Sequence, residues 1–84
     1  MLVKELAHEL RPHGIRVNAV SPGWIGAGES AADLIPLGRA GVPEDVAPMA
    51  VALLDDAVSG YVTGADLAID GGLALHSWLD HTEA

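Results

Sequence analysis

The 84-residue sequence has no cysteine, no phenylalanine, one tyrosine and two tryptophans. The absence of cysteine excludes a disulfide framework and any thiolate metal site, and is typical of the cytoplasmic location that we expect. Basic residues are scarce too, because 12 acidic side chains against 4 basic ones give a formal net charge of -8. Since a surface of this sign repels phosphate backbones and anionic lipids, we expect neither a nucleic-acid nor a membrane partner.

Long hydrophobic runs are also missing. No stretch approaches the roughly 18 apolar residues of a membrane-spanning helix, and no basic segment leads into an apolar one as in a signal peptide. Half of the residues are hydrophobic, but they are mainly alanine, valine and leucine. Because so short a chain buries little surface, we expect a single truncated module over residues 1–84 that gains stability by association.

Hydrophobic periodicity predicts alternating helices and strands. An amphipathic helix runs from Leu2 to Leu10, and Pro12 and Gly14 end it. The apolar, β-branched run from Ile15 to Val20 predicts a short strand, which the following Ser-Pro-Gly breaks.

A second helix is predicted over residues 43–56, where a proline followed by two acids suits a helix N-terminus. Asp55 and Asp56 are expected to end it, and a second strand is predicted from Ala65 to Ile69. Strand, helix and strand form a βαβ unit, which places two parallel strands side by side. The fold class is therefore α/β, with a partial Rossmann-like unit.

Four stretches have a recognisable order and spacing: Glu5-Leu6-Ala7 with Arg11-Pro12-His13-Gly14-Ile15-Arg16-Val17-Asn18, then Ser21-Pro22-Gly23-Trp24-Ile25, then residues 36–47, and finally Gly60-Tyr61-Val62-Thr63-Gly64 through Ile69-Asp70-Gly71-Gly72. Together they resemble the C-terminal portion of the short-chain dehydrogenase/reductase family. This resemblance implies a three-layer fold with a parallel sheet and an NAD(P) cofactor. It also places Pro22, Gly23 and Ile25 beside the nicotinamide and makes the loop from Trp24 to Leu37 a substrate lid.

The sequence departs from the family where hydride chemistry is concerned. Ala27 stands where the family prefers a threonine, and Tyr61 and Lys4, the only residues of their kinds, form no Tyr-x-x-x-Lys pair. Glycines 23, 26 and 28 lack the Gly-x-Gly-x-x-Gly spacing of a phosphate-binding turn. We therefore expect this chain alone to bind no cofactor and to transfer no hydride.

Two roles are compatible with these absences. The first is a self-associating module that forms a homodimer or larger assembly through residues 46–54, residues 65–69 and the C-terminal tail, since the resembled family commonly pairs its last strand and preceding helix. The second is one part of a split oxidoreductase that another chain completes. In both, an unpaired strand edge favours association.

A third interpretation starts from Ser21, which lies between small residues after a strand, as in the Gly-x-Ser-x-Gly turn of hydrolases. A nucleophilic serine needs a histidine base and an orienting carboxylate, which here would come from a set of downstream residues: His76, His81, Asp70 and Asp80. The alternative function is thus a small serine-type ester or lactone hydrolase. Pro22 argues against it, because a residue before proline avoids the helical conformation of that turn.

The remaining candidate residues favour structural roles. The histidine pairs, His8 with His13 and His76 with His81, are five residues apart and do not share a helical face, so no metal site is predicted. Arg39 is expected to bond within its own loop rather than to bind phosphate. Trp24 and Trp78 are expected to pack in a core or an interface rather than to line a ligand pocket.

Overall fold

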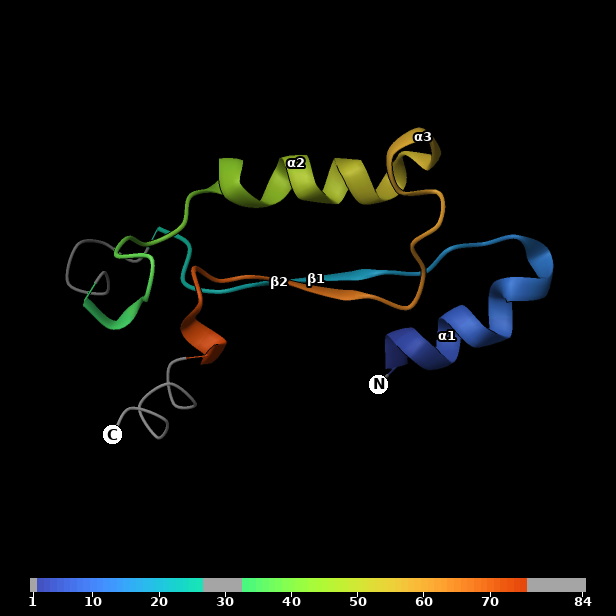
Figure 1. The fold of residues 1–84 in the computed structure, drawn as a ribbon, viewed down its shortest axis with the longest axis horizontal. Coiled ribbons are helices and arrows are strands. Elements are labelled where there is room, and N and C mark those ends of the chain that lie inside the picture. The colour runs from blue at the N-terminus through green and yellow to red at the C-terminus, as the bar shows by residue number, and fades with distance from the viewer. Residues whose placement is uncertain (1, 27–32, 76–84) are drawn as a thin grey trace.

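The computed structural model describes residues 2–26 and 33–75. Its helices and strands, in chain order, are α1 (Leu2–Leu10), β1 (Ala19–Pro22), α2 (Pro43–Leu54), α3 (Asp56–Ser59) and β2 (Asp66–Ile69). The strands β1 and β2 pair in parallel, with Ala19 opposite Asp66 and Pro22 opposite Ile69. The predicted α/β class and the βαβ unit are confirmed, and Figure 1 shows α2 crossing above the strand pair.

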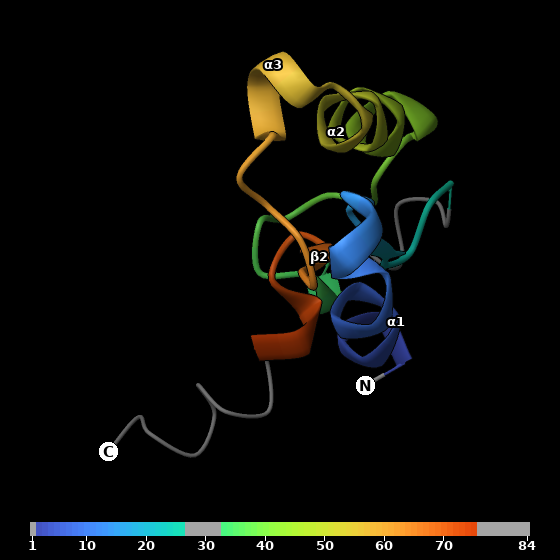
Figure 2. The same cartoon turned by 90° about the vertical axis from the view of Figure 1, so that its right-hand side faces the viewer.

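The helix α1 has the predicted bounds and is followed by a 3-10 turn over Arg11–His13. Gly14 ends this turn with a φ of 68°, a left-handed conformation that glycine adopts without steric cost. Two contacts hold α1 near the loop before β2: the Lys4 ammonium donates to the Gly64 carbonyl at 2.9 Å, and Ala7 is buried. Figures 1 and 2 place α1 on the opposite side of the strands from α2.

The first strand differs from its predicted bounds of Ile15 to Val20, because β1 continues through the Ser-Pro segment that was expected to end it. Alternate residues of a strand face opposite edges, and here Ala19 and Gly23 donate to the carbonyls of Ala65 and Ile69. The nitrogen of Pro22 therefore faces away from β2. The missing N–H costs no bond in the ladder.

Before β1, side chains supply most of the bonds, beside one backbone bond from the Gly64 N–H to the Val17 carbonyl at 2.7 Å. The Thr63 hydroxyl accepts from the Val17 N–H at 3.1 Å, and Asn18 binds two backbone groups at 3.0 Å, donating to the carbonyl of Val62 and accepting from the N–H of Ala65. These residues are extended but are held by side-chain bonds, so the regular strand starts later than the apolar pattern predicts.

The helix α2 ends two residues earlier than predicted. Asp55 is extended, and its carboxylate accepts from the Ala57 N–H at 2.9 Å, which starts the short helix α3. Asp55 thus ends one helix and caps the next. Ser59, the last residue of α3, is buried and donates its hydroxyl to the Ala52 carbonyl at 2.7 Å.

The two faces of the strand pair differ. Val20 and Leu67 are register partners on the face toward α2, whereas Ser21, Asp66 and Ala68 are exposed on the other face. Among the described residues, the buried hydrophobic residues are Ala7 and Ile35, and no large side chain is fully buried. None of the helices in residues 2–26 and 33–75 is long and apolar enough to cross a membrane.

Candidate functional site at the carboxyl ends of the strands

The two strands end in close contact at Gly23 and Asp70. Gly23 donates its N–H to the Ile69 carbonyl at 3.0 Å. A Cβ placed on Gly23 would lie 2.7 Å from the Asp70 Cβ and 2.9 Å from its Cα, closer than such atoms approach. Only glycine fits this position without displacing the turn after β2.

Asp70 shapes the turn that follows β2. Its carboxylate oxygens accept from the N–H groups of Gly72 and Ala74 at 2.9 and 3.1 Å. The adjacent Gly71 carbonyl accepts from the Leu37 N–H at 2.9 Å. The loop before α2 is thereby attached to the end of β2.

Backbone hydrogen bonds join the two ends of the long loop between β1 and α2. Gly41 donates to the Trp24 carbonyl and accepts from the Gly26 N–H, both at 2.9 Å, which makes a parallel bridge between Ile25 and Gly41. Ile25 is half-buried and touches the space where a side chain on Gly41 would lie. The end of the loop therefore lies beside the residues that follow β1, just before α2 begins.

An ion pair links this loop to the start of α2. The two terminal nitrogens of Arg39 bind the two carboxylate oxygens of Asp45 at 2.8 and 2.9 Å, and Asp45 also accepts from the Val42 N–H at 2.8 Å. These bonds, first from Arg39 and then from Val42, lower the pKa of Asp45 to about 2. The same pairing raises the pKa of Arg39. Arg39 also donates to the Ala40 carbonyl within its own loop at 3.3 Å, whereas its ion pair reaches the first turn of α2.

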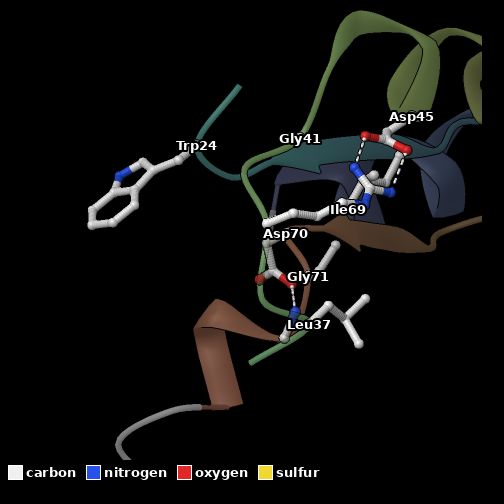
Figure 3. A pocket seen from close by; sticks show the side chains of 10 residues that line it. Trp24, Leu37, Gly41, Asp45, Ile69, Asp70 and Gly71 are labelled. Carbon is white, nitrogen blue, oxygen red and sulfur yellow. Dashed lines mark hydrogen bonds and ion pairs between the residues drawn. The ribbon is translucent and has the colours of Figure 1, made fainter. Parts of the chain in front are cut away.

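These segments enclose a pocket of about 350 Å³. Leu37 and Ile69 supply apolar walls, and the Arg39–Asp45 pair and Asp70 supply polar ones (Figure 3). Trp24 lies at the pocket with 42% of its surface exposed, and its indole ring extends away from the ion pair. Trp24 does not pack in a core of this chain, and its packing in an interface stays a prediction. Trp78 lies outside the described residues.

The residues assigned to the nicotinamide side lie together near this pocket. Pro22 is exposed, Gly23 is occupied by its contact with Asp70, and Ile25 packs on Gly41. In the described residues, the long helix that follows a strand is α2, which carries Glu44 and Asp45 in its first turn, and carboxylates at that position repel a pyrophosphate. The described residues thus do not fit a whole dinucleotide. Ala27 lies outside them.

Ser21 has a partner other than a catalytic base. Its hydroxyl donates to the Asp66 carboxylate at 2.7 Å, across the exposed face of the strand pair. The proposed base candidates His76 and His81, and Asp80, lie outside the described residues, while Asp70 is used in its own turn. Within the part of the chain that the structure describes, no group of three metal-ligating side chains occurs.

Sequence reasoning did not identify the Asp45 and Asp70 interactions. A signal for the first was present, since a carboxylate at the third position of a helix often accepts from the residue before the helix. The second depends on which way the chain turns after β2, and a single Asp-Gly-Gly allows several turns. The pocket arises from this turn, and the sequence alone does not define it.

Comparisons with known proteins agree with this geometry. Residues 1–74 match the family model described as enoyl-(acyl carrier protein) reductase. The chain is 47% identical over 81 residues to protein FixR of Bradyrhizobium diazoefficiens, covering 88% of this chain and 29% of that protein. It is 45% identical over 84 residues to the 3-oxoacyl-[acyl-carrier-protein] reductase FabG of Thermotoga maritima, covering 88% of this chain and 34% of that protein.

A solved structure also matches this chain. The crystal structure of a short-chain type dehydrogenase/reductase from Mycobacterium marinum superposes with a TM-score of 0.76 at 48% identity, covering 86% of this chain and 29% of the other. The chain thus spans about a third of the length of the relatives that it matches. On the sequence motifs, the parallel strand pair and these comparisons, the chain belongs to the short-chain dehydrogenase/reductase family.

Proposed function

We propose that this chain corresponds to the C-terminal portion of an NAD(P)-dependent short-chain oxidoreductase, that it does not transfer hydride by itself, and that it serves as a self-associating module. The observation that carries the proposal is the contrast between a very small core and a large exposed apolar surface. In the described residues Ala7 and Ile35 are the buried hydrophobic residues, whereas Leu54 and Tyr61 are 81% and 104% exposed. Burial of such surface is the main driving force for association.

The outer side of α2 and α3 is the part of this surface that best suits an interface. Val51, Leu54 and Val58 are 64%, 81% and 67% exposed, and the exposed ring of Tyr61 follows them. A helix that carries apolar residues on several sides is normally buried on more than one of them. The interface predicted over residues 46–54 therefore extends onto α3.

Sedimentation velocity of the purified chain at micromolar concentration tests this proposal. We expect a dimer or a larger species, and we expect Val51→Glu and Val58→Glu to shift it toward the monomer because each buries a charge at the contact. Leu2→Glu is the matched control, since Leu2 is 68% exposed on α1 and away from this surface. A well-folded monomer for the unaltered chain would contradict self-association.

Hydride transfer requires a bound nicotinamide nucleotide, so nucleotide binding gives a separate test. Adding the chain to NADH or NADPH should leave the nicotinamide fluorescence unchanged, because the chain has neither a Gly-x-Gly-x-x-Gly turn nor a Tyr-x-x-x-Lys pair. Saturable binding of either nucleotide would contradict this part of the proposal.

A second candidate role is one part of a split oxidoreductase that another chain completes. The observation that favours it is the free edge of β1, which has no strand partner other than β2 in the described residues. Mixing the chain with a candidate complementing polypeptide and measuring NAD(P)-dependent oxidation tests this role directly.

A further inference from the structure

The turn after β2 contains the one Asp-Gly step of the chain. Asp70 is followed by Gly71, whereas every other aspartate precedes a residue with a side chain, and the single asparagine, Asn18, precedes Ala19. A following glycine leaves the carboxyl carbon of an aspartate open to attack by the next backbone nitrogen, because no side chain hinders the approach. Asp70 is therefore the position in this sequence that most favours closure of a cyclic imide.

The groups that this reaction needs lie together in the turn. Gly71 and Gly72 have φ values of 64° and 90°, which glycine adopts without steric cost. Among the hydrogen bonds of residues 2–26 and 33–75, none uses the Gly71 N–H as its donor. Asp70 and Gly71 are half-buried and line the 350 Å³ pocket, so water reaches them. The carboxyl, the nitrogen and the water are thus all present at one place.

The folded turn opposes the reaction. The two carboxylate oxygens of Asp70 accept from the N–H groups of Gly72 and Ala74 at 2.9 and 3.1 Å. One of these oxygens has to leave as water, so its hydrogen bond is lost when the imide forms. The close approach of Gly23 to the Asp70 Cβ also leaves this side chain little room to turn. The reaction therefore requires a local opening of the turn.

We propose that Asp70-Gly71 is a modification site, at which Asp70 isomerises to isoaspartate when the turn opens, and that the contacts of the folded turn set the rate. The Gly71 nitrogen bonds to the Asp70 Cγ and gives up its proton to the departing hydroxyl, which leaves as water. A second water adds to the main-chain carbonyl carbon of Asp70 and breaks its bond to the Gly71 nitrogen. The chain then runs through Cγ, and its mass is unchanged.

Isomerisation would change the pocket wall. It inserts the Cβ and Cγ of Asp70 into the main chain and so shifts Gly71 relative to β2. The 2.9 Å bond from the Leu37 N–H to the Gly71 carbonyl and the fit of Asp70 against Gly23 both depend on the original spacing. The loop before α2 would therefore separate from the end of β2. The proposal goes beyond the proposed function, because the reaction occurs within one chain and needs no association.

Incubation of the complete chain in heavy-oxygen water tests the proposal. The chain is kept at neutral pH, either in native buffer or in concentrated urea, then digested in ordinary water, and its peptides are separated by chromatography and weighed. An isomerised peptide elutes apart from the original and carries one heavy oxygen atom, because hydrolysis of the imide takes that atom from water. We expect this product at Asp70 and not at Asp66, which precedes Leu67. It should form at least about tenfold faster in urea, where the turn is open.

Variants test whether the turn sets the rate. Gly23→Ala places a methyl group against Asp70 and should speed isomerisation in native buffer about tenfold. Gly14→Ala is the matched control, since its added Cβ meets nothing within 4 Å, and it should leave the rate unchanged. Ala74→Pro removes one N–H from the Asp70 carboxylate without adding bulk at Gly23, and should also speed the reaction. Circular dichroism checks that each variant is folded.

The outcomes separate the chemistry from its control by the turn. Absence of heavy oxygen at Asp70 in urea would overturn the modification site. Equal rates in urea and in native buffer, or an unchanged rate in both Gly23→Ala and Ala74→Pro, would overturn protection by the folded turn. An equal acceleration in Gly14→Ala would also overturn it, since general loss of stability would then explain the effect. Sedimentation of the fresh chain tests self-association separately from all of these results.

Discussion

The two ends of the strand pair are held by different chemistry. At the amino end, side chains add to a backbone bond from Gly64 to Val17: Asn18 binds the backbone at both Val62 and Ala65, Thr63 accepts from Val17, and Arg16 donates to the Val62 carbonyl at 3.1 Å. At the carboxyl end, glycines let the backbone segments approach, and one carboxylate shapes the turn.

This difference predicts different responses to substitution. A lost side-chain bond at the amino end is partly replaced by water, so its removal is moderately destabilising. A clash at the carboxyl end has no such replacement, because the obstructing atoms are backbone and Cβ atoms of Asp70. The experiments below test this comparison, starting with the largest expected effect.

Gly23→Ala should destabilise the chain by about 2 to 3 kcal/mol, because the added methyl group meets Asp70. Chemical denaturation followed by circular dichroism measures the change. Gly14→Ala is the control, since nothing lies within 4 Å of an added Cβ there and only its left-handed φ is strained. That strain costs about 1 kcal/mol. Equal effects of the two substitutions would show that the close approach at Gly23 is relieved by movement of the turn.

Asn18→Ala should lower the free energy of unfolding by about 2 kcal/mol, because it removes one donor and one acceptor for backbone groups at the amino end. Thr63→Val, which keeps the shape but loses one bond to Val17, should cost about 1 kcal/mol. The same denaturation measurement compares them. If Asn18→Ala lowered the free energy of unfolding more than Gly23→Ala, the amino end would contribute more to stability than the carboxyl end, and the comparison would be reversed.

The Arg39–Asp45 pair at the carboxyl end predicts a dependence on pH. The pKa of Asp45 is lowered to about 2 from 3.8, so its contribution to stability is fully present above about pH 4 and is lost as the pH falls toward 2. Asp45→Asn should therefore lower the thermal midpoint at pH 6, and the gap to the unaltered chain should narrow below pH 4. Glu44→Gln in the same helical turn is the control. A gap that stays constant down to pH 2 would exclude this linkage.

Much of the fold was predictable, and the errors have identifiable causes. The bounds of α1 and the start of β2 followed from periodicity to within one residue. The start of β1 was misplaced because side chains of Asn18 and Thr63 take the place of ladder bonds, which no apolar pattern signals. Its end was misplaced because Ser21-Pro22-Gly23 was taken as a turn signal, whereas Pro22 fits the strand because its nitrogen faces away from β2.

For the site, the sequence alone determined the family motifs and the acidity of the chain, since these depend only on which residues are present and in what order. Tertiary structure decided the rest. It paired Arg39 with Asp45, brought Gly23 against Asp70, and joined Asn18 to Ala65. These features join segments up to 47 residues apart, as in the bond between Asn18 and Ala65, so they depend on where the chain returns in space.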